Sequence, residues 1–213
     1  MHGVYTPHHF RVDDRTEIAA VIRANSFATL VTHGPRGLTA SHLPFLYEES
    51  ADSAGKLVAH MARANEQWRD FANGEVLVIF QGEHGYISPR WWTTQPSVPT
   101  WNYEIVHAYG VPRILDDKPR VIATLGATVL AYEPANSTYA MEKLPAEYVE
   151  KMTEAIVAFE IPIARCEGKF KLSQNRSRED VRGVVHALEK SGDPANFRLA
   201  ASMRRANHDL LQA

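Results

Sequence analysis

Strand-like segments that follow one another with hardly a helix between them are the feature that most constrains this fold. Residues 27–33 (FATLVTH) and 38–48 (LTASHLPFLYE) are β-rich, and the turn sequence GPRG separates them, which predicts a hairpin over 27–48. Further strands are expected over 57–62, 75–82, 85–92 (the hairpin partner of 75–82) and 101–115. A parallel sheet would need regular alternation of strands and helices, so this order favours an antiparallel barrel with helices packed outside.

Helices are predicted at the start of the chain, once among the strands, and in the C-terminal half. We expect them from Asp14, over 64–72, from Asp117 to about Tyr132, over 145–160, over 178–190 and from Asp193 to near the end. Ser177 and Asp180 are the predicted caps of the fifth. Residues 161–174 are expected to form a strand pair or one long bent strand.

The fold class predicted from this order is mainly antiparallel β with helices, an α+β arrangement. We expect a single domain over residues 1–213. Its parts are a barrel core at 1–115, a helical insert at 116–160, barrel strands at 161–175 and C-terminal helices at 176–213.

Composition excludes several classes of protein. The single cysteine, Cys166, rules out an internal disulfide framework and zinc sites built on several cysteines. No stretch approaches the roughly 18 apolar residues of a membrane span, and the first residues hold no apolar signal segment, so a cytoplasmic protein without membrane contact is expected. The ten histidines show no H-x-x-x-H spacing, so no metal site is predicted.

Charge is distributed unevenly along the chain. The formal net charge is −2, yet ten lysines and arginines stand against five acidic residues between Arg165 and Arg205. This part of the chain is a candidate surface for an anionic partner such as DNA. The alternative is a pair of solvated helices.

Residues 57–68 (LVAHMARANEQW) contain a candidate phosphate site. A helix that starts at about Ala64 would present backbone N–H groups to an anion, with Arg63 at its mouth and Asn65 and Gln67 beside it. A surface arginine in a loop is the competing interpretation.

Aromatic and basic side chains accompany this segment. Residues 39–46 and the Trp101–Asn102–Tyr103 run combine apolar walls with a few polar groups, as suits a flat heteroaromatic ligand. Lys169 and Lys171 project to one side of a strand and could complete an anion site. A hydrophobic core and a solvated sheet edge are the alternatives.

Together, seven segments resemble the FMN-binding negative transcriptional regulator family, the PaiB-like proteins. They are VYTPHHF (4–10), FATLVT (27–32), ASHLPF (40–45), AHMARANEQW (59–68), VIFQGEHGYISPRWW (78–92), VPTWNYEIVHAYG (98–110) and GKFKLSQNRS (168–177). The resemblance implies an FMN-binding split β-barrel, similar to pyridoxamine-phosphate-oxidase-like barrels, with a C-terminal helical extension. It also implies a homodimer that holds FMN between its subunits.

The resemblance assigns cofactor-binding residues in three groups. The strand Thr39, Ala40, Ser41, His42 and Leu43 would lie along the isoalloxazine ring. The phosphate and ribityl chain would be held by His60, Met61, Arg63, Ala64 and Asn65. The partner subunit would supply Trp101, Asn102, Tyr103, Lys171 and Gln174.

Three functions are compatible with the resemblance. The first is an FMN-binding negative regulator of transcription, although the sequence shows no clear helix-turn-helix, and DNA is a possible partner only through the basic C-terminal part. The alternative is a flavin-dependent oxidoreductase, pyridoxamine-phosphate-oxidase-like or flavin-reductase-like, of unknown substrate. No catalytic side chain is predicted, because in flavin chemistry the cofactor supplies the reactive atom. A binding protein without catalysis is the third possibility.

Overall fold

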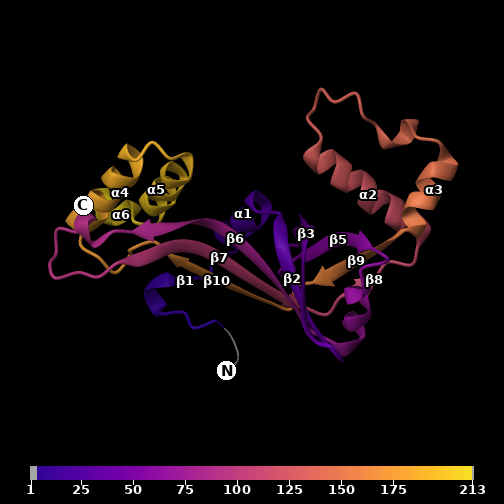
Figure 1. Cartoon of the computed structure of the whole chain (residues 1–213), viewed down its shortest axis with the longest axis horizontal. Helices are drawn as coiled ribbons and strands as arrows, with labels where there is room; N and C mark the ends of the chain where they lie inside the picture. The colour runs from indigo at the N-terminus through magenta and orange to yellow at the C-terminus, as the bar shows by residue number, and fades with distance from the viewer. Residues whose placement is uncertain (1–3, 213) are drawn as a thin grey trace. The chain divides into compact units, whose positions relative to one another are not determined.

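A computed structural model describes residues 4–212, and these form two compact units. The terminal unit contains the residues up to Ala24, Gln81–Val106 and the chain from Glu167; the central unit contains Asn25–Phe80 and His107–Cys166. Figure 1 labels the elements of both. Three strands contribute residues to both units: β6 (Val76–Ile87), β7 (Thr100–Gly110) and β10 (Arg165–Lys171).

The central unit is built from two antiparallel sets of strands. β2 (Phe27–Gly34) and β3 (Gly37–Pro44) form the predicted hairpin, and β2 also pairs with the first part of β6. The second sheet has the order β4-β5-β9-β8, with bounds Leu46–Glu48, Lys56–Ala62, Ile156–Pro162 and Arg113–Ile114.

Aromatic side chains fill the core of the central unit. Phe45, Phe80 and Phe159 are almost completely buried. Phe45 meets the other two edge-on at ring-centroid distances of 6.1 and 6.3 Å, a favourable geometry for aromatic pairs. Phe71, from the 3₁₀ helix η2 (Glu66–Asn73), packs on Phe159 at 4.8 Å. The short helix is therefore part of the core.

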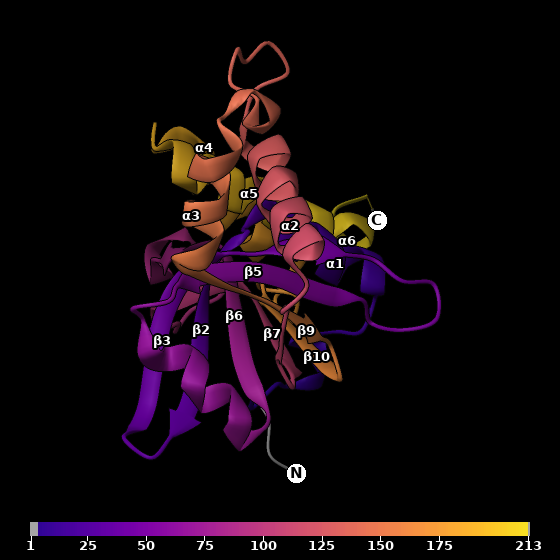
Figure 2. The ribbon, with the colours of Figure 1, turned by 90° about the vertical axis from the view of Figure 1, so that its right-hand side faces the viewer.

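Two helices join β8 to β9 and lie over the outer face of the β5–β9 pair, as Figures 1 and 2 show. They are α2 (Lys118–Tyr132) and α3 (Ala146–Glu154), separated by the 3₁₀ helix η4 (Met141–Lys143). Asp117 caps α2 by accepting a hydrogen bond from the Arg120 N–H, as predicted. Val121 packs with Leu115 and Ala158, so a small apolar cluster attaches α2 to β9.

The terminal unit places helices on strands in the order β1-β10-β7-β6. Its further elements are η1 (His8–Phe10), β1 (Arg11–Val12), α1 (Arg15–Ala24), η3 (Pro89–Trp91), α4 (Arg178–Lys190), α5 (Pro194–Ala206) and α6 (His208–Gln212). Asp14, Ser177 and Asp193 accept hydrogen bonds from backbone N–H groups at the starts of α1, α4 and α5, so these predicted caps are confirmed.

Asp180 has a different role from the predicted cap. Its Oδ1 accepts hydrogen bonds from the Thr93 N–H, the Thr93 hydroxyl and the Thr94 N–H at 2.7–2.9 Å. The carboxylate therefore fixes the loop after η3 to the start of α4. Gly183 allows this close approach, because a Cβ there would lie only 2.3 Å from the Trp91 carbonyl oxygen.

Several predicted elements are wrong in type or extent. The helix expected over 145–160 ends at Glu154, and 156–162 form β9, because the apolar run IVAFEI is buried between β5 and β8. Residues 85–92 are no hairpin partner: β6 continues to Ile87 as one strand, and Pro89 opens η3. The strand expected over 38–48 breaks at Phe45. The helix expected over 64–72 is a 3₁₀ helix that begins at Glu66.

In the part of the chain that the structure describes, no helix is long and apolar enough to cross a membrane. The predicted single domain and its four parts stay a prediction.

Candidate functional site

In the central unit, side-chain hydrogen bonds connect β3 to the segment that follows β5. The Asn65 side-chain Nδ2 donates to the Ser41 hydroxyl at 2.9 Å, and Asn65 Oδ1 accepts from the Gln67 N–H as the cap of η2. Two of the predicted cofactor-binding groups, 39–43 and 60–65, are thus brought together. The cap occupies the position where a free helix start at Ala64 was predicted.

A buried polar network fixes η2 on the hairpin. The Gln67 Nε2 donates to the carbonyl oxygens of Leu30 and Thr39 and contacts the Thr32 hydroxyl, at 3.1–3.2 Å. Thr32 in turn donates to the Asp70 carboxylate at 2.9 Å. From the sequence, Gln67 was expected only to be a polar neighbour of Arg63, and no role was predicted for Asp70. Their i, i+3 spacing on an otherwise amphipathic turn was the available signal.

Gly34 is required by the same network. A Cβ at this position would lie 1.9 Å from Asp70 Oδ1, so no larger residue fits without moving the carboxylate. The end of β2 is therefore shaped to receive Asp70.

Arg63 reaches across to the junction of α3 and β9. Its Nε donates to the Glu154 carbonyl and its Nη2 to the Ile156 carbonyl, both at 2.7 Å. Within residues 4–212, no carboxylate pairs with this guanidinium. The backbone carbonyls orient the side chain but leave its positive charge uncompensated, so Arg63 is suited to bind an anion.

The five predicted residues of β3 divide between two faces, because side chains alternate along a strand. Thr39, Ser41 and Leu43 are half-buried, whereas Ala40 and His42 are exposed. Phe27 of β2 stacks on His42 with ring centroids 6.3 Å apart. A flat ligand along β3 would therefore meet one set of side chains and the backbone.

His60 and Met61 also point in opposite directions. Met61 is buried in the core, and His60 is half-buried on the face covered by α2. The His60 Nδ1 is buried without a hydrogen-bond partner among the described residues. Burial lowers the pKa of His60, so its imidazole is neutral near pH 7.

The remaining predicted residues belong to the terminal unit. Asn102 is buried on the inner face of β7, where its Nδ2 donates to the Ser173 hydroxyl at 2.9 Å and contacts the Met203 sulfur. Trp101 and Tyr103, its neighbours in sequence, alternate to the outer face, and Trp101 is about half exposed. The Gln174 amide is used by the turn after β10: it accepts from the Leu172 N–H and donates to the Phe170 carbonyl.

Two lysines of β10 share the outer face with these aromatic rings. Lys171 donates to the Thr100 hydroxyl and the Trp101 carbonyl, and the Lys169 ammonium lies 5.6 Å from the ring centroids of Tyr5 and Tyr103. Burial, and then the charges of Lys169 and Arg176, lower the pKa of Lys171. Neither lysine has a carboxylate partner in the described chain.

Comparison with known proteins identifies the family. The family described as "Putative FMN-binding domain" matches residues 4–165. The chain is also 35% identical over 202 residues to the Bacillus subtilis "Protease synthase and sporulation protein PAI 2", covering 94% of this chain and 96% of that protein. The chain belongs to this FMN-binding family. The PaiB-like resemblance and the FMN cofactor predicted from the sequence are confirmed.

Solved structures share the fold. The flavocytochrome Anf3 of Azotobacter vinelandii superimposes with a TM-score of 0.63 at 16% identity, over 76% of this chain and 70% of that chain. The FAD and heme binding protein of Mycobacterium smegmatis gives 0.53 at 14% identity, over 81% and 78%. The predicted fold class, antiparallel β with helices of the split-barrel type, is confirmed.

The residues present fit FMN chemically. A phosphate monoester needs positive charge and hydrogen-bond donors, which Arg63, Asn65 and Ser41 provide in the central unit. The isoalloxazine needs an apolar surface, and Phe27, which stacks on His42, is exposed on the β2–β3 hairpin. When bound, FMN supplies a ring system that accepts and returns electrons. No group of three metal-ligating side chains exists among residues 4–212.

Proposed function

We propose that this protein is a cytoplasmic homodimer that binds FMN and acts as a negative regulator of transcription. The observation that carries the flavin assignment is the uncompensated Arg63 guanidinium in the segment that Asn65 ties to Ser41 of β3. In this proposal Arg63 holds the phosphate, and Asn65 and Ser41 bind the phosphate or the ribityl hydroxyls. His60, Met61 and Ala64 form the backbone wall of this site.

The buried network behind η2 keeps these groups in place. Gln67 and Asp70 bind β2 and β3 from the inside, so the segment 63–66 has little freedom to move away from Ser41. Such support reduces the conformational entropy that this segment loses when a ligand binds. The β3 segment 39–43 presents its backbone and one set of side chains to the isoalloxazine.

The exposed face of the β2–β3 hairpin supports the homodimer. Phe27 is 68% and Leu38 is 76% exposed, at opposite ends of one face of the hairpin, and the other face of β2 is buried. Exposed large apolar side chains on a sheet face are typical of a protein–protein interface. A second copy that covers this face would bring the partner's flavin-binding group, with Lys171, Trp101 and Tyr103 at its surface, to complete the site; Asn102 and Gln174 would support it from behind.

A titration with FMN tests the cofactor site. Wild-type protein should quench the flavin fluorescence with saturation at one FMN per chain and show a flavin absorption band after gel filtration. The elution volume and light scattering should give the mass of a dimer. A colourless protein that leaves FMN fluorescence unchanged would refute the proposal, and a monomeric FMN complex would refute the homodimer alone.

The regulatory role rests on the family and on the relative in Bacillus subtilis, which is named a sporulation protein. A gel-shift series at several salt concentrations, with FMN-loaded and FMN-free protein, examines direct DNA binding. Binding that weakens steeply with salt is expected for phosphate contacts. If no fragment upstream of the protein's own gene or its neighbours shifts, the direct-regulator version fails.

A flavin-dependent oxidoreductase is the second candidate, because the fold is shared with a protein named a flavocytochrome. Anaerobic addition of NADH or NADPH to the FMN complex distinguishes the two functions. Bleaching of the flavin band at a rate proportional to nucleotide concentration would favour the enzyme. An unchanged spectrum with both nucleotides would favour the regulator.

A further inference from the structure

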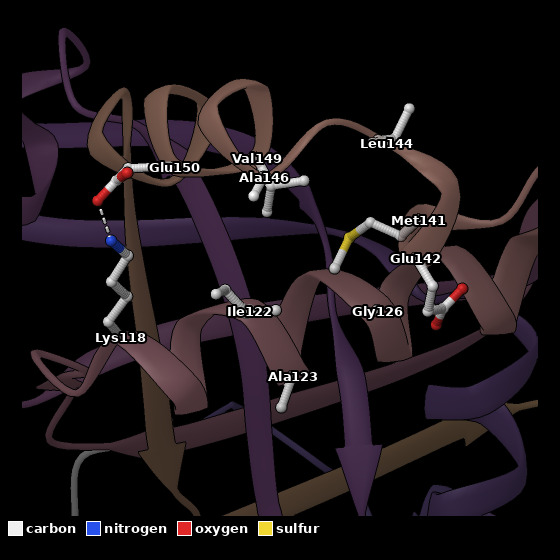
Figure 3. A pocket seen from close by; sticks show the side chains of 10 residues that line it. All are labelled: Lys118, Ile122, Ala123, Gly126, Met141, Glu142, Leu144, Ala146, Val149 and Glu150. Atoms are coloured by element: carbon white, nitrogen blue, oxygen red, sulfur yellow. Dashed lines mark hydrogen bonds and ion pairs between the residues drawn. The ribbon is translucent and has the colours of Figure 1, made fainter.

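Two cavities lie beside α2 in the central unit, and both are lined by residues of the segment that contains η4. One has a volume of about 480 Å³ and is shown in Figure 3, where the ion pair of Lys118 and Glu150 closes one end and Met141 extends toward α2. The other has a volume of about 430 Å³ and adjoins β5. Met141, Leu144 and Val149 line both.

The cavity next to β5, called the β5 cavity below, is lined mainly by aromatic and apolar side chains. Besides the three shared residues, the lining comprises Leu125, Val129, Tyr132, Tyr139, Tyr148 and Met152, together with the polar residues His60, Thr128 and Glu133. The three tyrosines are each about half exposed, so their rings form walls that are not filled by the protein itself. Its volume lies in the range of roughly 300–1,000 Å³ that is usual for small-molecule sites.

The walls of the β5 cavity are held in place without a ligand. The Tyr132 hydroxyl donates to the Ser26 hydroxyl at 2.7 Å, and the Lys118–Glu150 ion pair, which lines the neighbouring cavity, connects α2 to α3. Thr128 is engaged within α2, where its hydroxyl donates to the Thr124 carbonyl. The site is therefore preformed, which favours binding.

His60 is the polar residue of the β5 cavity whose hydrogen-bonding capacity the described chain leaves unsatisfied. Its imidazole is neutral because of burial, so it offers one N–H donor and one acceptor nitrogen, and its Nδ1 has no partner within the described chain. A buried polar atom without a partner costs free energy, which a ligand with a complementary group would recover.

We propose that the β5 cavity binds a flat aromatic molecule of one or two rings that carries one hydrogen-bonding group, with His60 as its polar partner. The tyrosine rings and the two methionines favour stacking and thioether–aromatic contacts with such a ligand. Arg63, Ser41 and Asn65 do not line this cavity, and His60 enters the proposed flavin site through its backbone alone, so the cavity is separate from the proposed phosphate site and goes beyond the proposed function.

Methionine methyl NMR tests the proposal directly. Indole serves as the probe, because it is a two-ring aromatic with a single N–H. In protein labelled at the methionine methyl carbons, indole should shift the Met141 and Met152 signals with saturation. Met203, in α5 of the terminal unit, should stay unchanged and is the internal control. If neither the Met141 signal nor the Met152 signal shifts at an indole concentration of about 10 mM, the proposal is wrong.

Matched ligands and variants locate the polar contact. 1-Methylindole lacks the N–H and should bind about tenfold more weakly than indole, as expected for one lost hydrogen bond to a buried acceptor. In the His60→Leu variant this preference should disappear. Equal affinities of the two probes for the wild-type protein would contradict the role given to His60.

Two neighbouring positions on α2 provide a steric test. Val129 lines the β5 cavity, whereas Leu130 is 82% exposed. Val129→Trp should fill the cavity and abolish the indole shifts, and Leu130→Trp should leave them unchanged. Indole binding that survives Val129→Trp would place the probe elsewhere and overturn the proposal.

FMN separates this inference from the proposed function. Saturating FMN should leave the indole affinity within about twofold, since the two sites share no charged group. Competition between FMN and indole would show that the β5 cavity is part of the flavin site, and the proposal of a separate site would fail. If FMN does not bind at all, the proposed function fails while the indole result still stands.

Discussion

The cations of the candidate flavin site and three arginines of α5 have opposite surroundings. Arg63 and Lys171 donate to backbone carbonyls and a hydroxyl, and neither has a carboxylate partner in the described chain. Arg198, Arg204 and Arg205, on α5, each pair with a glutamate at 2.8–3.5 Å.

This difference corrects the impression given by charge counting. Two of the glutamates, Glu83 and Glu104, lie on β6 and β7, outside the basic segment from Arg165 to Arg205. The local excess of positive charge in the sequence is therefore reduced within the terminal unit by acidic residues distant in sequence. A cation is better judged as an anion ligand by whether a carboxylate already neutralises it.

Arg63→Ala gives the largest expected effect. Removing a charged donor to phosphate should weaken FMN binding about 10- to 100-fold, from the roughly 1.5–3 kcal/mol that a charge-assisted hydrogen bond contributes. Arg204→Ala, which removes a cation already paired with Glu189, should leave FMN affinity unchanged. Fluorescence titration of both variants measures the contrast.

Arg63 also binds the carbonyls of Glu154 and Ile156, so folding needs its own control. Thermal unfolding should show that Arg63→Ala loses little stability, and Arg63→Lys should recover part of the FMN affinity because it retains the charge. Equal effects of Arg63→Ala and Arg204→Ala on FMN binding would remove the distinction between the two sets of cations.

The pH dependence of FMN affinity provides a second test, at Lys171, with a smaller expected effect. Its pKa lies below the ordinary lysine value because of burial and the nearby charges of Lys169 and Arg176. FMN affinity should therefore fall, by up to about tenfold for one lost charge contact, as pH rises toward the ordinary lysine range. Lys171→Arg keeps its charge and should flatten this profile. A wild-type profile that matches Lys171→Arg would exclude Lys171 from phosphate binding.

The sequence predicted local structure well wherever a cap or turn carries its own signal. Asp14, Ser177 and Asp193 cap helices as expected, Asp117 begins a helix where one was predicted, and the turn at 34–37 joins the two strands of the predicted hairpin. These signals depend only on residues within a few positions of one another. The family motifs are also short local segments, and the FMN cofactor was predicted from them.

Features that depend on distant partners were not predictable. The run IVAFEI continues the apolar spacing of α3 and reads as helix until β5 and β8 are available on either side of it. The Asp180 carboxylate was assigned to its own helix although it binds Thr93 and Thr94, 87 and 86 positions away. Likewise, nothing near Gln67 in the sequence indicates that its amide binds Leu30 and Thr39.

Glu104, the carboxylate partner of Arg205, provides a test among the paired groups. Burial raises its pKa above the ordinary 4.5, even though Arg205 lies 3.5 Å away. The folded state holds this proton more tightly than the unfolded state, so the contribution to stability is full below pH 4.5 and is lost as pH rises through the raised value. Relative to Glu104→Gln, the wild-type protein should thus lose unfolding free energy across that range. Urea unfolding at several pH values measures it, and parallel curves would contradict the prediction.

The Arg204–Glu189 pair should show the smallest effect. Both guanidinium contacts to the carboxylate are short, at 2.9 and 3.0 Å, but the arginine side chain is 55% exposed. Exposed pairs typically contribute about 0.2–1 kcal/mol, so a double-mutant cycle with Arg204→Met and Glu189→Gln should give a coupling energy in that range. FMN affinity should be the same in all four proteins, because α5 contributes no residue to the candidate flavin site. A change in FMN affinity on freeing Arg204 with Glu189→Gln would show that pairing, and not position in the fold, keeps these arginines from acting on an anion.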